Sequence, residues 1–161
     1  MNQNLVQFHV GDEIERNAMS LKLCPFGTLR VFPEGSFSHP GPITTRAAAP
    51  LLSVEWKTEV LGEVSLRVGM GSYLQGAYAA HVTVRMALET EDGVPFFFEY
   101  KSVGDMESHV RGETPVFLAG LIEIDPSIER YAWLNRVQFV GRGMLSMDPI
   151  CQTYDMDYTA P

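Results

Sequence analysis

Basic side chains are scarce in this chain. Among its 161 residues, 12 are Lys or Arg and 20 are Asp or Glu, which gives a formal net charge of −8 and a pI near 4.9. Proteins that follow nucleic-acid phosphates need clustered Lys and Arg, and the sequence has no such cluster. It also has no basic amphipathic helix that would favour an anionic membrane surface. The composition therefore predicts an acidic protein that binds neither nucleic acid nor membranes.

Long apolar runs are missing as well. The first ten residues, MNQNLVQFHV, lack the basic start and apolar core of a signal peptide. No run elsewhere approaches the ~20 apolar residues that a membrane-spanning helix needs. We therefore expect a cytoplasmic location.

Motifs for metals and cofactors are also absent. The two cysteines, Cys24 and Cys151, lie far apart without a CxxC or a paired histidine spacing, so two buried free thiols are expected. Gly69–Gly76, GMGSYLQG, does not match the dinucleotide pattern GxGxxG, and neither a GxSxG elbow nor a phosphate loop is present. We expect no metal and no cofactor. The four histidines show no metal-ligand spacing: His9, His39, His81 and His109.

What the sequence does contain is a period of two in its apolar residues, with Gly and Pro spread along the whole length. This pattern favours about eight to ten short strands over long helices. We predict an all-β chain with one short helix, folded as an antiparallel β-barrel that is closed or nearly closed, because closure removes exposed strand edges. A β-sandwich is the alternative. A length of 161 residues suits a single domain, 1–161, that buries ~70% of its unfolded surface.

Individual elements follow from local signals. The clearest is a hairpin over His81–Lys101, in which HVTVRMALET and VPFFFEYKS flank the turn Glu91-Asp92-Gly93. The Pro-rich segment 33–50 predicts a loop or lid, because proline removes backbone donors from a ladder. Gly104–Glu113 reads as a short helix with Asp105 as N-cap and Gly112 as its stop. Further strands are expected at Leu5–Val10, Leu52–Val64 with a break at Gly62, Val64–Met70, 115–124, 137–143 and 149–158.

The stretch YAWLNRVQFVGRG, Tyr131–Gly143, carries a resemblance to a known family. The order of hairpin, short helix, strand and this stretch resembles the domain of unknown function 3237 family over about residues 83–143. Tyr131, Trp133, Leu134 and Asn135 match the family's Tyr-x-Trp-Leu-Asn motif. The resemblance implies a compact β-barrel with a central cavity, often oligomeric, and no activity established for the family as a whole.

The chain departs from that family at two polar positions. Thr83 stands where members usually carry an Asp, two residues before the Arg that Arg85 matches. An Arg common in the strand before the motif is replaced near Leu118 or Ala119. Any chemistry that these groups perform in relatives would be altered in this chain.

Polar residues alternate along the hairpin strands, so His81 and Arg85 share one face of the first strand, and Glu99 and Lys101 share one face of the second. This face either points to water or lines a polar cavity. Lys101 beside aromatic residues suggests a Schiff-base nucleophile, but the nearby Glu99 favours a charged lysine. Glu123 alternates with apolar residues in LIEI. It is either half-buried, with a raised pKa suited to proton transfer, or an exposed strand residue.

The motif residues offer a second kind of contact. If Tyr131 and Trp133 lie two residues apart at the entry of a strand, both rings point to one side, and Asn135 continues that side with an amide. Such a trio could hold a flat ligand and polarise its carbonyl. The structural alternative is that Trp133 plugs a barrel end and Asn135 bonds to a loop backbone.

Two functions follow. The first is a cofactor-free acid/base enzyme of isomerase, cyclase, hydratase or lyase type that acts on a small apolar or polycyclic carbonyl compound in the barrel cavity. In this hypothesis Glu123, His81 and Glu99 move protons, and the substrate is held by Tyr131, Trp133, Asn135, Arg85 and Lys101. The second is a non-catalytic small-molecule binder or carrier with the same cavity. In either case we expect a homo-oligomer, a dimer or larger.

Overall fold

The computed structural model describes residues 21–76, 79–105, 107–108 and 111–160. Strands dominate it. They are β1 (Leu23–Pro33), β2 (Phe37–Pro40), β3 (Thr45–Thr58), β4 (Gly62–Gln75), β5 (Ala80–Glu89), β6 (Pro95–Gly104), β7 (Val116–Ile124), β8 (Phe139–Met147) and β9 (Ile150–Thr159). Between β7 and β8 lie a short α-helix, α2 (Glu129–Ala132), and a 3-10 helix, η2 (Trp133–Arg136).

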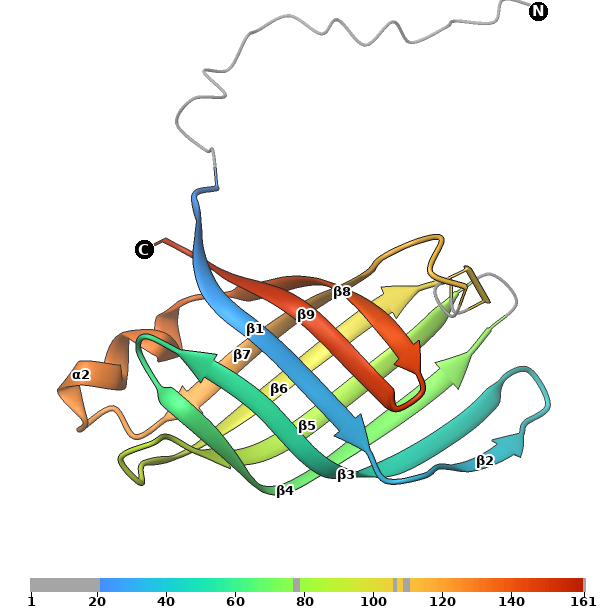
Figure 1. Ribbon diagram of the computed structural model, residues 1–161, viewed down its shortest axis with the longest axis horizontal. Coiled ribbons are helices and arrows are strands. Elements are labelled where there is room, and N and C mark those ends of the chain that lie inside the picture. Colours follow the sequence, from blue (N-terminus) through green and yellow to red (C-terminus); the bar gives the residue numbers. More distant parts are fainter. Residues whose placement is uncertain (1–20, 77–78, 106, 109–110, 161) are drawn as a thin grey trace, which may run out of the picture.

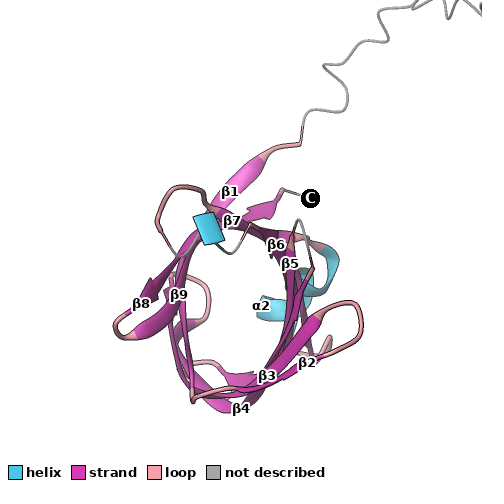
Figure 2. Ribbon diagram, turned by 90° about the vertical axis from the view of Figure 1, so that its right-hand side faces the viewer, coloured by secondary structure: helices cyan, strands magenta, loops and turns pink. Residues whose placement is uncertain are grey.

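The strands form one antiparallel sheet that closes on itself. Its order is β1-β9-β8-β7-β6-β5-β4-β3-β2, and β1 also pairs with β3 from Thr28↔Lys57 to Pro33↔Leu51. Eight strands therefore complete a barrel, and β2 adds a ninth beside the N-terminal part of β3. Figure 1 shows the barrel from the side, and Figure 2 shows the closed ring along its axis. The predicted β-barrel is confirmed, and the sandwich alternative is excluded because all the strands of the described residues belong to one closed sheet.

The predicted hairpin is also confirmed. β5 and β6 pair from Ala80↔Gly104 to Glu89↔Pro95. Gly93 takes a φ of 84° in the turn, a conformation that glycine adopts without steric cost. The break expected at Gly62 is the turn between β3 and β4, where φ is 67°.

The Pro-rich segment 33–50 differs from the prediction, since it forms β2 and the start of β3 and not a structureless loop. Two of its prolines lie where the ladder ends or changes partner. Pro40 ends β2, which is an edge strand paired only with β3. Pro50 accepts a hydrogen bond from the backbone N–H of Glu34 at the point where the partner of β3 changes from β1 to β2. The missing N–H of Pro50 faces the gap between these two strands.

The helical predictions have a mixed outcome. Asp105 accepts a hydrogen bond from the backbone N–H of Glu107, and Gly112 has a φ of 72°. Both features agree with the predicted ends of the helix at Gly104–Glu113. The helix itself lies partly outside the described residues. The strand predicted at Leu5–Val10 also lies outside them. No helix in the described part of the chain is long and apolar enough to cross a membrane.

The expectation that Tyr131 enters a strand is wrong. Residues 129–136 are helical, and the strand begins only at Phe139. Asp125 starts this change, because its backbone carbonyl accepts the N–H of Ile128 and its side chain accepts the N–H of Ser127 in a turn. The short helices then lie across one end of the barrel, where α2 is visible through the ring in Figure 2.

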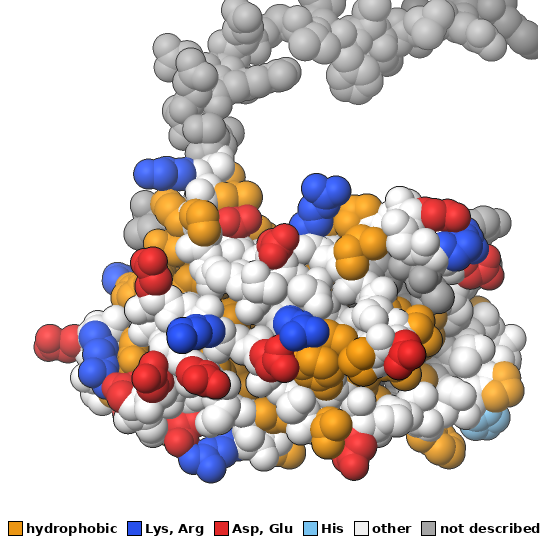
Figure 3. Space-filling model, viewed as in Figure 1, with side chains coloured by type: hydrophobic (Ala, Val, Ile, Leu, Met, Phe, Trp, Pro, Cys, Tyr) orange, Lys and Arg blue, Asp and Glu red, His pale blue; other side chains and the backbone are white. Residues whose placement is uncertain are grey.

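Alternation along each strand separates the core from the surface. On β5 the inward residues are Val82, Val84, Met86 and Leu88, which are buried, while their neighbours point outward. The inward positions of all the strands form one apolar cluster that fills much of the barrel. The outward positions carry most of the charges, and acidic and basic side chains are interspersed on the face drawn in Figure 3.

Inward glycines on β7 and β8 make room for rings from neighbouring strands. A Cβ on Gly143 would lie 2.3 Å from the carbonyl oxygen of Thr153 and 2.4 Å from the Tyr154 ring, and one on Gly120 would lie 2.7 Å from the Phe98 ring. β8 continues past Gly141 and Gly143 to Met147, beyond the end at 143 that the sequence predicted.

Replacing Gly143 by Ala should therefore lower the free energy of unfolding by ~1–3 kcal/mol or more, since ~1–3 kcal/mol is the usual cost of overpacking. Unfolding in urea measures this change. Gly71→Ala is the matched control, because a Cβ there meets its nearest atoms at an ordinary 3.7 Å. Equal stability of the two variants would contradict this account of the glycines.

Candidate functional site

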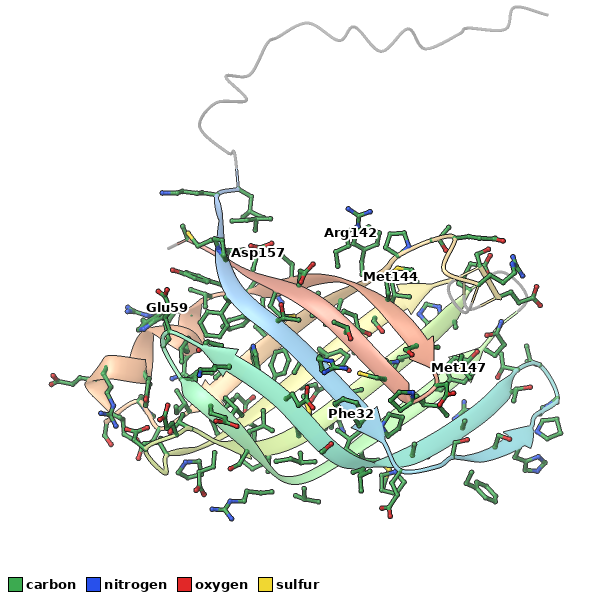
Figure 4. The ribbon with its side chains drawn as sticks, viewed as in Figure 1. Phe32, Glu59, Arg142, Met144, Met147 and Asp157 are labelled. Carbon is green, nitrogen blue, oxygen red and sulfur yellow. The ribbon has the colours of Figure 1, made fainter. Side chains whose placement is uncertain are left out.

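A cavity of about 380 Å³ opens inside the barrel at the end away from α2. It lies under β2 and the start of β3, beside the end of β8 at Met147, which is labelled in Figure 4. Its lining comes from seven strands and the segment before β2: Val31, Pro33, Ser36, Ser38, Thr45, Ala47, Ala48, Ala49, Leu51, Gly71, Ser72, Tyr73, Val82, Val84, Leu145, Met147, Ile150 and Gln152.

Side-chain size explains why this end is hollow. At the α2 end the lumen is filled by aromatic side chains, among them Trp56, Phe98 and Phe139, whose rings contact one another at centroid distances of 5.0–6.0 Å. At the open end the inward positions of β3 and β4 hold Ala47, Ala49 and Gly71. Small residues on adjacent strands leave space that nothing else in the described chain fills.

Among the described residues, the cavity lining carries no charged side chain. These residues include no Asp, Glu, Lys, Arg or His, and their polar groups are hydroxyls and the amide of Gln152. An apolar wall with a few fixed neutral polar groups is typical of a site for a small uncharged molecule. An ion entering such a cavity would lose its hydration without gaining a partner of opposite charge.

Gln152 is held in one orientation by two buried tyrosines. Its Oε1 accepts hydrogen bonds from the hydroxyl groups of Tyr100, at 3.1 Å, and Tyr154, at 3.4 Å. Its Nε2 makes no hydrogen bond within the described part of the chain. Gln152 is half-buried and lines the cavity. Its free amide N–H groups are therefore donors available to an acceptor on a bound molecule.

Burial keeps the two tyrosines neutral. It raises the pKa of Tyr100 well above the ordinary value of 10.0, and it also raises the pKa of Tyr154. The Ser102 hydroxyl is buried nearby and makes no hydrogen bond within the described chain. Both tyrosines therefore remain hydrogen-bond donors to Gln152 at neutral pH.

Tyr73 is the one ionisable side chain among the described residues that line the cavity. Its hydroxyl donates a short hydrogen bond to Oε1 of Gln75, and Nε2 of Gln75 donates to the carbonyl of Gly76. Desolvation raises the pKa of Tyr73 above 10.0. The group is therefore a neutral hydroxyl near pH 7 that can give a proton or a hydrogen bond.

The residues predicted to move protons are not in this cavity. Glu123, Glu99 and His81 occupy outward positions of β7, β6 and β5, because the buried residues beside them point inward. The expectation that they line the lumen is therefore wrong. Aromatic residues stand on both faces of β6, so the sequence pattern could not tell which face was the inner one.

The structure does bring four predicted site residues together, but on the outside of the barrel. Arg85, Glu99, Lys101 and Glu123 line an external cleft of about 510 Å³ over β5, β6 and β7. Arg85 and Glu99 form an ion pair of 2.9 Å, in which Arg85 is exposed and Glu99 is half-buried. His81 lies apart from them, in a different surface depression that also contains His39.

Tyr131 and Trp133 close the α2 end of the barrel. Because they lie on a helix, their rings do not share a side. The Tyr131 ring is buried and its hydroxyl donates to Oδ1 of Asp92 at 2.9 Å, which ties the helix to the β5–β6 turn. The Trp133 ring packs against Tyr158 at 5.1 Å. The arrangement matches the structural alternative, in which the motif closes a barrel end.

Asn135 replaces a missing strand partner. The pairing of β7 with β8 stops at Gly120↔Phe139, so the last residues of β7 have no ladder on that side. The side chain of Asn135 accepts the backbone N–H of Ile124 and donates to the Ile124 carbonyl, both at 3.0 Å. This amide makes the two bonds that a neighbouring strand would have made. Asn135 therefore binds backbone, as the structural alternative for this residue supposed.

Metal-binding groups are not assembled in the described part of the chain, where no three His, Cys, Asp or Glu side chains lie together. Cys24 is half-buried, Cys151 is buried, and both are free thiols.

The cavity residues carried a signal that the sequence analysis missed. In ICQTYDMDY, the inward positions of β9 include Gln152, Tyr154 and Met156, a polar amide in line with core residues. Small residues alternate in Ala47 and Ala49 and again in Gly69 and Gly71. Two such runs on paired strands indicate a place where a core cannot be filled.

Comparisons with solved structures place this barrel among known folds. A conserved protein of unknown function from Rhodopseudomonas palustris matches with a TM-score of 0.73 at 19% identity, covering 88% of this chain and 99% of that one. A β-barrel like protein from Acinetobacter baumannii AYE matches at 0.70 and 18%, covering 88% and 97%. An enzyme from Penicillium herquei matches at 0.62 and 13%, covering 84% and 94%. At these identities the likeness concerns the fold alone.

Sequence comparisons add no assignment. No family model matches the chain, and no curated protein matches it. The resemblance to the domain of unknown function 3237 family stays a prediction.

Replacing Asn135 by Ala should unpair the N–H and C=O of Ile124 and lower the free energy of unfolding by about 1–2 kcal/mol. For a chain of this size the melting temperature should fall by roughly 3–6 °C, measured by circular dichroism. Arg136→Ala, a change at the next and exposed residue, is the control and should have little effect. An unchanged melting temperature in Asn135→Ala would remove its assigned role.

The buried tyrosines predict a loss of stability at alkaline pH. Because the folded chain holds the Tyr100 and Tyr154 protons more tightly than the unfolded chain does, the unfolded chain releases them first as pH rises above about 10. Their contribution to stability is complete below that pH and declines above it. Urea unfolding across this range should show the decline, and it should be shallower in Tyr154→Phe. Parallel curves for the two proteins would be inconsistent with a raised pKa.

Proposed function

We propose that this protein binds a small, uncharged, largely apolar molecule in the open end of its barrel. The observation that supports this most directly is the lining of the cavity, which has a volume of about 380 Å³ and no charged side chain. The absence of a carboxylate, imidazole or amine from this lining favours a binder or carrier over an acid/base enzyme, which needs a group of that kind in reach of its substrate.

The ligand class follows from Gln152. Its Oε1 is engaged by the two tyrosines, so Nε2 is the group left to meet a ligand, and it can only donate. A matching ligand carries a hydrogen-bond acceptor, such as a ketone, ester or ether oxygen, on an otherwise apolar body. The hydroxyl of Thr45 offers a further polar contact near the mouth. Small apolar carbonyl compounds therefore fit the cavity best.

A catalytic role is the second candidate. One structural neighbour is described as an enzyme, and Tyr73 places a neutral hydroxyl at the cavity wall. In that case Tyr73 would donate a hydrogen bond or a proton to the carbonyl oxygen of the substrate. The cytoplasmic location expected from the sequence also stays a prediction.

Binding can be tested with 6-propionyl-2-dimethylaminonaphthalene, an uncharged fluorescent ketone whose emission changes in apolar surroundings. We expect saturable binding by the full chain and its loss in Gly71→Leu, which places a side chain in the cavity. Ser65→Leu, on the outward face of the same strand, is the matched control and should bind normally. If the intact chain does not bind the probe, or if Gly71→Leu binds as well as Ser65→Leu, the proposed cavity function is wrong.

The role of Gln152 can be separated from general apolar binding. Displacement of the probe should be compared for 2-acetylnaphthalene and 2-ethylnaphthalene, which differ in one carbonyl group. In Gln152→Met the ratio of the two affinities should shift about 10-fold toward the hydrocarbon, the value of one hydrogen bond near 1.4 kcal/mol. An unchanged ratio would show that Gln152 does not contact the carbonyl.

Catalysis has its own readout. Exchange of the methyl hydrogens of 2-acetylnaphthalene in deuterium oxide, followed by NMR, reports proton transfer next to the carbonyl. A pure binder leaves the exchange at its background rate. Exchange that is accelerated by the intact chain and lost in Tyr73→Phe, with probe binding retained, would instead establish the enzymatic alternative.

A further inference from the structure

The outer wall over β6 and β7 exposes large apolar side chains. Phe97 is 61% exposed, Phe117 60%, Leu121 52% and Val103 46%. Strand register places them together, because Val103 lies opposite Phe117, and Phe97 and Leu121 flank Glu99 on the same face. Single exposed apolar residues are common, but four on two adjacent strands indicate a surface that binds another macromolecule. We call these four residues the outer apolar patch.

The charges around the outer apolar patch balance within it. The external cleft beside it carries Arg85, Lys101, Glu99 and Glu123, which sum to zero, although the whole chain has a net charge of −8. Two copies of an acidic protein repel each other over most of their surfaces. They can approach at this neutral wall without that repulsion.

Two of these charges lack partners within the described chain. Glu99 is paired with Arg85, whereas Lys101 and Glu123 are exposed and take part in no ion pair there. Lys101 and Glu123 lie at the two ends of one diagonal across β6 and β7. The midpoint of this diagonal lies between Glu99 and Leu121, which are paired. Lys101 is two residues beyond Glu99 on β6, and Glu123 is two residues beyond Leu121 on the antiparallel β7.

We propose that the outer apolar patch is the interface of a symmetric homodimer, in which Lys101 of each copy pairs with Glu123 of the other. Consider a two-fold axis that lies in the interface plane and crosses the line from Lys101 to Glu123 at its midpoint, at right angles. This axis places Lys101 of each copy opposite Glu123 of the other, so both ion pairs form at once. An isologous interface needs this kind of self-complementary surface. The same axis passes near Glu99 and Leu121, so the Glu99 side chains of the two copies approach each other there, each with its own Arg85 beside it.

Shape and size agree with this arrangement. The external cleft has small residues, Ala119 and Gly120, in its lining, beside the projecting rings of Phe97 and Phe117. A partner's projecting side chain can therefore enter it. Three strands of about ten residues cover roughly 15 Å by 30 Å, and with side-chain relief and the adjoining β8 this approaches the ~800 Å² per partner of a standard interface. Arg142, opposite Phe117 on β8, points away from the barrel at the edge of this wall (Figure 4).

The test is a charge exchange in the full chain, with dimerisation measured by analytical ultracentrifugation over a range of concentrations. Lys101→Glu and Glu123→Lys should each weaken the dimer about 10-fold or more, because each places like charges together twice. The double variant Lys101→Glu/Glu123→Lys should regain most of the affinity. Circular dichroism should be unchanged throughout, because both side chains are exposed.

Lys57→Glu on β3 is the matched control. It makes the same change in net charge at an exposed position outside the patch and should leave the dimer intact. A wild-type chain that stays monomeric at the highest concentration overturns the proposal, as does a dimer that is equally stable in every variant. If the single variants dissociate and the double variant does not reassociate, the proposed pairing of Lys101 with Glu123 is overturned.

Discussion

The pairing of β1 with β3 is the constraint on which the rest of this structure depends. It joins the two ends of an eight-stranded sheet, so that every strand acquires an inner and an outer face. Because side chains alternate along a strand, this one closure decides the surroundings of each residue at once. Gln152 becomes a cavity residue by this means, and Glu123 becomes a surface residue.

Inside the ring, side-chain volume varies along the barrel axis. Aromatic side chains fill the end covered by α2, and glycines at 120 and 143 let the rings of Phe98 and Tyr154 approach the backbone. Alanine and glycine at the other end leave the cavity open. The two buried tyrosines lie between these regions and connect them through Gln152, whose amide faces the open space. The packed end therefore positions the polar group of the hollow end.

The YAWLN segment illustrates how far local sequence can be interpreted. Its aromatic residues and its asparagine indicated either ligand contact or closure of the barrel, and the pattern alone did not separate them. The hydrogen bonds of Asn135 to Ile124 depend on where the β7–β8 ladder stops, which is a property of two strands and not of the motif. The turn at Asp125 made this segment helical, and the alternation assumed for Tyr131 and Trp133 did not apply.

The sequence by itself determined the all-β class, the hairpin of β5 and β6 and most of the strand positions, because period-two alternation and turn glycines act within a few residues. It also determined which side chains share a face, as with Arg85 and His81. Only the tertiary structure decided which face is inside, since that depends on β1 meeting β3, whose paired residues are 18 to 29 positions apart in the chain. The cavity likewise arises from small residues on several strands, whose effect exists only after the barrel has closed.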